Sequence, residues 1–373
     1  MDAAAGDISI VTNLMETRLI CGSADMLETL MRVTSPKKIW PSANFYRGKI
    51  EEQRERYRKH DDTEYNLEPN IKEAPGGLRD IQLMTWTAKR HFGVNRRSDL
   101  VQQAFMLEEE YRTLYNDEEF LWRVRYGLHL IAERAEERLL FDYQRELAGM
   151  FGYTDGNGKL AVEKFMQRYY RTVLSIRGLT DVLHQHLNEV IYRGNKTSVN
   201  KVINERFILR DNLLDTISEG TFNDHPSALL EVFVILGESN TIGGIRASAI
   251  RQIRRSVLLI DAKFRADAAN RHLFMRLLRA PYVLSLQLNR MNRYGILGKY
   301  LPEFGKIVGQ TQHDLFHIYP VDVHTLQVIK NIRRLARPDV AKQFPLPSHL
   351  FKNLAKPELI VIAALYHDIA KGR

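Results

Sequence analysis

Three residues in the C-terminal part of the sequence have the side chains needed to bind a metal ion. His367 and Asp368 are adjacent, and His324 lies 43 positions upstream in a stretch with helical spacing. Two imidazoles and a carboxylate that converge can hold one divalent cation, which activates water and polarises a phosphoryl oxygen. A His-Asp pair is common, however, and ordinary hydrogen bonding at a helix end would also explain it. The residues therefore predict a metal-dependent hydrolytic site if helices bring them together.

A second candidate site lies where Pro-Gly-Gly precedes a helical stretch. Gly76 and Gly77 would let backbone N–H groups point outward near a helix N-terminus, which favours a bound anion. Arg79 and Asp80 fall in the first turn of the same helix. These four residues predict a phosphate-binding site, although a plain helix entry has the same sequence features.

Hydrophobic periodicity predicts a mainly α-helical chain that positions these residues. Two stretches differ. Residues 8–12 are β-branched and apolar, which indicates a short strand, and residues 204–217 contain two apolar runs around Asp211-Asn212, which predicts a small β-hairpin. Elsewhere apolar residues recur with helical spacing. The predicted helices cover residues 42–59, 78–92, 100–115, 117–138, 143–151, 160–191, 226–237, 246–259, 272–288 and 357–371, with one more that begins near 323.

Composition excludes several classes of protein. The 373 residues, 44% of them hydrophobic, are enough for two or three domains with cores of their own, which excludes disorder of the whole chain. No apolar run approaches the roughly 20 residues of a membrane span. Cys21 is the single cysteine, so a disulfide framework is excluded, and residues 1–7 lack the features of a signal peptide. We therefore expect a cytoplasmic protein with no membrane partner.

The formal net charge of +9 raises the question of nucleic-acid binding. Basic residues alternate with acidic ones along the predicted helices, for example over residues 51–56 and 133–138. That alternation is typical of solvated helix faces with i,i+4 ion pairs. We therefore expect no nucleic-acid partner.

The motifs, taken together and in this order, resemble one enzyme family. The apolar helix predicted at the C-terminus ends in His-Asp-Ile-Ala-Lys-Gly, which resembles the HD phosphohydrolase superfamily. The segment Asn-Ile-Lys-Glu-x-Pro-Gly-Gly-Leu-Arg-Asp-Ile occupies residues 70–81. With these motifs, and with residues 12–19, 65–70 and 88–93, the sequence resembles the bifunctional protein-PII uridylyltransferase and uridylyl-removing enzymes over residues 10–373.

The resemblance implies an enzyme with two opposing activities. A nucleotidyltransferase domain transfers UMP from UTP to a tyrosine of the PII signalling protein, an HD domain hydrolyses that UMP off again, and ACT domains sense glutamine. It implies a divalent metal, Mg²⁺ or Mn²⁺, held by His324, His367 and Asp368, with Lys371 neutralising phosphate charge. Glu16, in a Glu-Thr-Arg-Leu segment that resembles a metal-binding strand of related nucleotidyltransferases, is the candidate for a third catalytic carboxylate there.

The resemblance also divides the chain into four predicted parts. The Asp-x-Asp pair of the nucleotidyltransferase would lie upstream of Met1 and the fourth HD ligand beyond Arg373, so we expect the chain alone to lack complete catalytic sites. The parts are a nucleotidyltransferase remnant with a short β segment of its sheet (1–62), a helical domain associated with the uridylyltransferase (63–195), a helical connecting region with the hairpin (196–312) and the first helices of an HD domain (313–373).

Two other functions stay open at this point. The chain could be a catalytically silent helical scaffold that binds PII. It could also be an HD-type phosphohydrolase of a small nucleotide, although the Pro-Gly-Gly-Leu-Arg-Asp-Ile segment has no reason to exist in such an enzyme.

Overall fold

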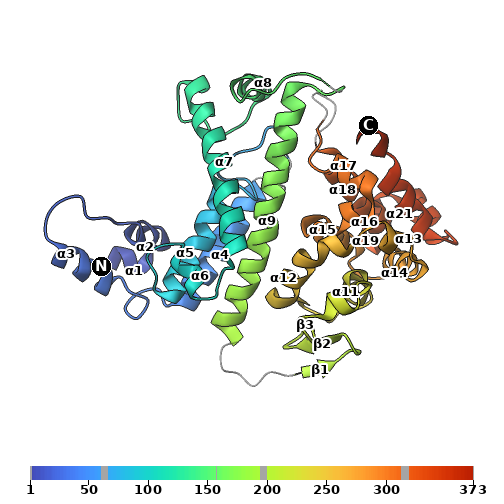
Figure 1. Ribbon diagram of the computed structural model, residues 1–373, viewed down its shortest axis with the longest axis horizontal. Coiled ribbons are helices and arrows are strands. Elements are labelled where there is room, and N and C mark those ends of the chain that lie inside the picture. Colours follow the sequence, from blue (N-terminus) through green and yellow to red (C-terminus); the bar gives the residue numbers. More distant parts are fainter. Residues whose placement is uncertain (1, 60–65, 157, 194–199, 312–318, 373) are drawn as a thin grey trace. The chain divides into compact units, whose positions relative to one another are not determined.

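The structure is a computed structural model that describes residues 2–59, 66–156, 158–193, 200–311 and 319–372 (Figure 1). The chain forms two compact units. Unit 1 comprises Met1–Glu64, Glu68–Tyr143 and Ser175–Lys196, and unit 2 comprises Tyr65–Leu67, Gln144–Leu174 and Thr197–Arg373. The boundaries expected at 62/63, 195/196 and 312/313 all lie outside the described residues, so the four-part division stays a prediction.

Unit 1 is built from helices. Helix α5 packs against α4 and α7, and its buried residues recur every three or four positions, as on the apolar stripe of an amphipathic helix. The helices are α1 (Asp2–Gly6), α2 (Ile8–Met15), α3 (Ala24–Val33), α4 (Ser42–Lys59), α5 (Leu78–Phe92), α6 (Asp99–Gln102) and α7 (Glu108–Ala132), while α8 (Phe141–Met150) and the 33-residue α9 (Ala161–Arg193) each contribute residues to both units.

The strand predicted for residues 8–12 is wrong, because this segment lies in helix α2. The Asp7 side chain caps the helix by accepting a hydrogen bond of 2.7 Å from the backbone N–H of Ser9. Val11 is fully buried and packs in one cluster with Phe45, while Ile8 and Met15 pack against that cluster from the same helix. Helical burial therefore outweighs the β propensity of the branched residues, and no strand occurs within residues 2–59 as described.

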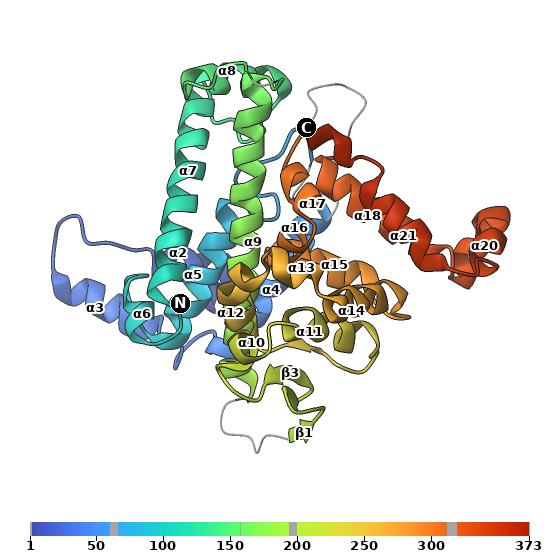
Figure 2. The same cartoon turned by 45° about the vertical axis from the view of Figure 1, so that its right-hand side comes forward.

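Unit 2 is a second helical assembly. Its most buried helix, α11, contacts α14 and α15. Figure 2 shows α18 and α21 side by side, in agreement with their contacts. The helices are α10 (Thr221–Asp224), α11 (Ala228–Gly237), α12 (Ala247–Arg255), α13 (Ala262–Ala266), α14 (Ala268–Arg279), α15 (Leu284–Arg293), α16 (Ile296–Tyr300), α17 (Pro302–Ile307), α18 (Val321–Arg334), α19 (Pro338–Gln343), α20 (Pro345–Lys352) and α21 (Pro357–Tyr366), with 3₁₀ helices η1 (Ser256–Leu259) and η2 (Ile369–Gly372).

A small four-stranded sheet also belongs to unit 2. Its strands β1 (Asn200–Val202), β2 (Phe207–Arg210), β3 (Leu213–Thr216) and β4 (Gly244–Ile245) follow one another in that order, antiparallel except for the parallel pair β3–β4. Asp211 and Asn212 join β2 to β3 with φ angles of 52° and 66°. Two consecutive left-handed residues are what a two-residue type I′ hairpin requires, and Asp and Asn tolerate them. The predicted hairpin is confirmed.

The mainly α fold class is confirmed, but several helix boundaries differ from the prediction. Helix α4 has the predicted bounds. The helix predicted over 100–115 is two helices, because Glu110 accepts a hydrogen bond of 2.9 Å from the N–H of Leu107 and starts α7 anew. The helix predicted over 272–288 is also interrupted, since Pro281 has no N–H to continue α14. The described helices include none that is both long and apolar enough to cross a lipid bilayer.

Candidate metal centre

Two packed helices of unit 2 carry the candidate metal ligands. Helix α18 begins directly after Pro320 and presents His324 from its first turn. Helix α21 begins at Pro357, ends at Tyr366 and is followed by the turn that carries His367 and Asp368. Because α18 and α21 pack against each other, the ligands meet in space although 43 positions separate them in sequence.

The structure brings the three predicted ligands together. One ligand atom from each of His324, His367 and Asp368 lies within 4.8 Å of the others, and no other such group of three occurs in the described part of the chain. The Nε2 atom of His367 lies 3.4 Å from Asp368 Oδ2, and that of His324 lies 3.9 Å from the same oxygen. The two imidazole side chains are 36% and 41% exposed, so a cation could reach them from solvent.

The tautomer of His367 fits a metal ligand. Its Nδ1 atom lies 2.7 Å from the carbonyl oxygen of Ala364, which can only accept, so Nδ1 carries the proton and donates. In the neutral ring this leaves the lone pair on Nε2, the atom that faces Asp368. A backbone carbonyl that fixes the orientation of a ligating imidazole is a common outer-shell arrangement in metal sites. The donor set therefore fits a divalent cation.

Lys371 places a positive charge beside the carboxylate of this cluster. Its Nζ atom donates a hydrogen bond of 3.0 Å to Asp368 Oδ2. Burial alone would raise the pKa of Asp368, but the hydrogen bond and charge of Lys371, together with the nearby imidazoles, outweigh it and hold the pKa below its usual value. Asp368 is thus a carboxylate at neutral pH, as a metal ligand must be.

A buried aspartate fixes the start of α18. Asp322 accepts a hydrogen bond of 3.0 Å from the N–H of Gly309 and one of 3.2 Å from the side-chain amide of Asn292. Burial raises its pKa to about 6 despite these bonds. The two bonds fix the turn that presents His324, two residues further on.

The second candidate site is organised around Asp80, which is fully buried. Its carboxylate accepts hydrogen bonds of 2.5 Å from Arg56, 2.5 Å from the Tyr57 hydroxyl, 2.6 Å from the N–H of Gly76 and 3.1 Å from Gln53. Burial would raise its pKa, but the guanidiniums of Arg56 and Arg177 outweigh that effect and lower it. Sequence spacing gave no signal for these partners, since Arg56 and Tyr57 lie in α4 and Arg177 in α9.

The expectation that backbone N–H groups point outward at this helix start is wrong. The N–H of Gly76 donates to Asp80, that of Gly77 to the carbonyl of Ala74 at 2.9 Å, and that of Arg79 to the carbonyl of Lys72 at 2.9 Å. Gly77 is required by close packing, because a Cβ atom there would lie 2.5 Å from the carbonyl oxygen of Ile71. These contacts give no support to phosphate binding at Gly76 and Gly77, which stays a prediction.

The side chain of Arg79 is also engaged within unit 1. It donates to Gln82 at 2.9 Å, forms an ion pair of 3.3 Å with Glu73, and its guanidinium lies 5.5 Å from the ring centre of Trp86. A phosphate at this position would have to compete with the carboxylate of Glu73. The phosphate-binding role of Arg79 likewise stays a prediction.

Glu16 does not lie on a strand. It follows helix α2, where its carboxylate accepts a hydrogen bond of 3.0 Å from the Trp86 indole and lies 3.5 Å from Lys89 Nζ. Its side chain is half exposed and belongs to no group of three potential metal ligands among the described residues. Its catalytic role also stays a prediction.

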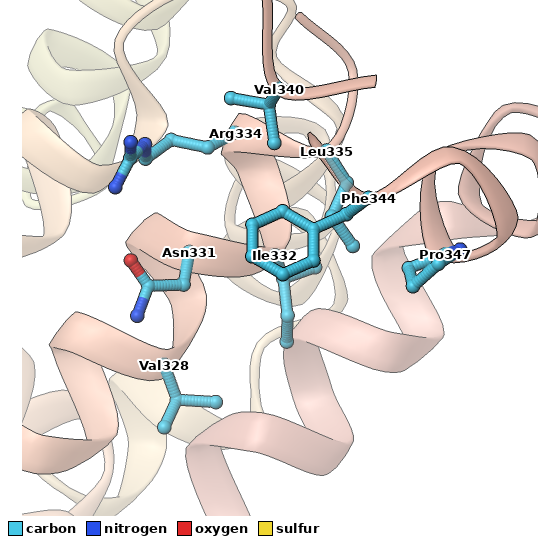
Figure 3. A pocket seen from close by; sticks show the side chains of 8 residues that line it. All are labelled: Val328, Asn331, Ile332, Arg334, Leu335, Val340, Phe344 and Pro347. Carbon is cyan, nitrogen blue, oxygen red and sulfur yellow. The ribbon is translucent and has the colours of Figure 1, made fainter. Parts of the chain in front are cut away.

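An apolar pocket of about 450 Å³ lies along the C-terminal half of α18 (Figure 3). It is separate from the candidate metal centre, since none of the three ligands lines it. Its mostly apolar walls offer little to a phosphoryl group. The lining residues are Val328, Asn331, Ile332, Arg334, Leu335, Val340, Phe344 and Pro347.

Comparison with known proteins identifies the class of this chain. A family model described as GlnD PII-uridylyltransferase matches residues 44–184, and one described as the third domain of uridylyltransferase GlnD matches residues 207–300. These matches define a uridylyltransferase-related protein. No solved structure matches the chain significantly.

Curated relatives identify the family. The chain is 52% identical to a protein of Azotobacter vinelandii (strain DJ), 51% to one of Ectopseudomonas mendocina and 50% to one of Pseudomonas aeruginosa (strain LESB58), each over 372 residues, and each is named bifunctional uridylyltransferase/uridylyl-removing enzyme. These alignments cover 100% of this chain but 41% of each relative. The chain belongs to the GlnD family of bifunctional uridylyltransferase/uridylyl-removing enzymes and spans about two fifths of the length of these relatives.

Proposed function

We propose that this chain is part of a cytoplasmic enzyme that adds UMP from UTP to a tyrosine of PII and hydrolyses it off again, with glutamine as effector of the intact protein. The names of the relatives support the two activities. The observation that carries the proposal for this chain is the convergence of His324, His367 and Asp368, which supplies ligands for the hydrolytic step.

The proposed centre would hold a divalent cation, Mg²⁺ or Mn²⁺. Of the two, Mn²⁺ suits the donor set better, because imidazole nitrogen is a softer ligand than the oxygen that Mg²⁺ prefers. When bound, the cation would polarise a phosphoryl oxygen and lower the pKa of a water molecule.

The residues of the chain have separate roles in that step. Asp368, His324 and the Nε2 atom of His367 would hold the cation, and the carbonyl of Ala364 keeps the proton of His367 on Nδ1. Lys371, whose ammonium already lies at Asp368, offsets the negative charge that develops on the phosphoryl group of uridylyl-tyrosine. The product would be UMP and the free tyrosine hydroxyl.

The test is His367→Asn in the protein as its gene encodes it. We expect removal of UMP from uridylylated PII to be lost and addition of UMP to be unchanged, measured by mass spectrometry of PII. The matched control is His272→Asn, which alters an exposed histidine of α14 outside the cluster. Removal of UMP at the normal rate by His367→Asn would contradict the proposal, and a wild-type protein with neither activity would favour a silent scaffold.

A further inference from the structure

Residues 308–311, which directly follow α17, contact both elements that carry the candidate metal ligands. Gln310 lies in this segment and is 7% exposed. Its backbone carbonyl accepts a hydrogen bond of 2.9 Å from the N–H of Val321, the first residue of α18. Its side-chain amide donates to the backbone carbonyl of Lys371, in the turn that follows Asp368. One residue thus joins the helix of His324 to the turn of His367 and Asp368.

The position of Asp368 depends on the turn at Lys371. The N–H of Lys371 donates to the carbonyl of Asp368 at 3.1 Å, so the peptide group that Gln310 holds belongs to the same turn as the ligand. A displacement of that turn would move Asp368 Oδ2 away from the imidazoles. A metal site tolerates little such error, because its ligands must be held at fixed distances and angles.

The remaining contacts of the segment fix the orientation of Gln310. The Oε1 atom of its amide accepts a hydrogen bond of 3.4 Å from Lys159 Nζ, which leaves the NH₂ end to face the Lys371 carbonyl. Gly309, with φ of 70°, packs against α9 so closely that a Cβ atom would lie 3.1 Å from the carbonyl of Gln167. Gly309 also donates to Asp322, so the residue that precedes Gln310 is held by both α9 and α18.

We propose that Gln310 is a positioning residue of the candidate metal centre, which it serves by holding the His367-Asp368 turn in register with His324. This proposal rests on the proposed function, because it assumes that the cluster binds a divalent cation. Gln310 itself touches neither the cation nor the substrate.

The experiment compares Gln310→Met with wild type in the protein as its gene encodes it. Methionine keeps the length of the side chain but cannot donate to Lys371. Two probes are used: the dissociation constant for Mn²⁺, from the paramagnetic resonance signal of free Mn²⁺, and the visible absorption spectrum of bound Co²⁺, which reports ligand number and geometry. The control Gln327→Met makes the same change on α18, where the Gln327 amide contacts only Asn331 among the hydrogen bonds described for it.

We expect Gln310→Met to raise the Mn²⁺ dissociation constant about 10-fold or more and to alter the Co²⁺ spectrum, with the melting temperature nearly unchanged. The control should leave all three unchanged. Wild-type affinity and spectrum in Gln310→Met would overturn the positioning role while the metal site stands. A wild-type protein that binds neither ion would overturn the proposed function itself.

A second variant, Gln310→Asn, tests the same contact if Gln310→Met does not fold. Gln310→Asn keeps the amide but is one methylene too short to reach the Lys371 carbonyl. It should show the same loss of Mn²⁺ affinity, and a folded Gln310→Asn protein with wild-type affinity would overturn the proposal.

Discussion

Asp80 and Asp368 are both aspartates beside basic side chains, but their surroundings differ in one decisive respect. Asp80 is fully buried, and both of its oxygens accept hydrogen bonds from other residues of unit 1. Asp368 is partly exposed, is held by one lysine, and faces two imidazoles at 3.4 and 3.9 Å. A carboxylate whose acceptor capacity is filled by the protein stabilises the fold, whereas one that faces other potential ligands is available to a cation. The comparison therefore separates a structural centre from a candidate chemical one.

The largest expected effect is that of Asp80→Asn. Loss of this charge removes the buried carboxylate that the guanidiniums of Arg56 and Arg177 share, and removing one partner of a buried ion pair costs about 3–5 kcal/mol in the free energy of unfolding. Urea denaturation followed by circular dichroism measures this loss of unfolding free energy. As long as unit 1 remains folded, Mn²⁺ binding in unit 2 should be unchanged. A loss below about 1 kcal/mol would show that Asp80 is not the structural centre described.

The lowered pKa of Asp80 predicts that the effect of Asp80→Asn on the unfolding free energy depends on pH. The pKa of Asp80 is lowered in the folded protein, so its contribution to stability is fully present above the unfolded pKa of about 3.9 and is lost as the pH falls through the lower folded value. The difference in unfolding free energy between wild type and Asp80→Asn should therefore be constant from pH 7 to pH 5 and shrink below about pH 4. A difference that grows on acidification would reverse the assigned direction of the pKa shift.

Gly77→Ala should have the next largest effect. The added methyl group would lie 2.5 Å from the carbonyl oxygen of Ile71, and overpacking of this kind costs about 1–3 kcal/mol. Gly149→Ala is the control, because a Cβ atom there meets no atom within 4 Å and its φ is not in the left-handed region. Equal melting temperatures for the two variants would contradict the close packing at Gly77.

Lys371→Met should have a smaller effect, and of opposite sign on two measurements. Removing an ammonium 3.0 Å from Asp368 relieves competition with a cation, so the Mn²⁺ dissociation constant should fall by up to about fivefold, equivalent to ~1 kcal/mol between charges at 4 Å in water. Removal of UMP should slow, because the charge that neutralises the phosphoryl group is gone. Slower removal with weaker Mn²⁺ binding would instead make Lys371 a structural part of the turn.

The smallest expected change in stability is that of Asp368→Asn. Its pair with Lys371 is near the surface, where such pairs contribute about 0–1 kcal/mol, so the unfolding free energy should change by no more than that. The Mn²⁺ dissociation constant should nevertheless rise by more than the roughly 10- to 100-fold typical of an outer-shell residue. A variant that is strongly destabilised and still binds Mn²⁺ would remove the contrast with Asp80.

Local patterns predicted those elements whose determinants are local. The charged amphipathic repeat predicted α4 with its observed bounds, and Asp211-Asn212 predicted the hairpin, because turn chemistry acts within two residues. The strand prediction for residues 8–12 is wrong because the β-branched residues of this segment are also spaced for one helix face. Packing of that face against Phe45 favours the helix. Periodicity alone does not distinguish these states in a short apolar run.

The candidate sites show the same limit. Resemblance to HD phosphohydrolases pointed to His324, His367 and Asp368, and the packing of α18 on α21 brings them together. Nothing in the sequence linked Asp80 to Arg177, 97 positions away, and without that partner a Pro-Gly-Gly helix start resembles an anion site. Gln310 was missed for a related reason, since a glutamine in a connecting segment carries no motif.

The interleaving of the two units along the chain has a consequence for synthesis on the ribosome. Unit 1 ends with Ser175–Lys196, so its helices cannot all assemble until residue 196 has left the exit tunnel, by which time Gln144–Leu174 of unit 2 is already made. At a translation rate of about 5–20 residues per second, synthesis of residues 197–373 takes roughly 10–35 s more. During this time the first half of α9 lacks the later residues of unit 2. A nascent chain in that interval lacks the residues around Gly309 that pack on α9 at Tyr170, and it is the stage at which a chaperone that recognises such exposed aromatic surface would act.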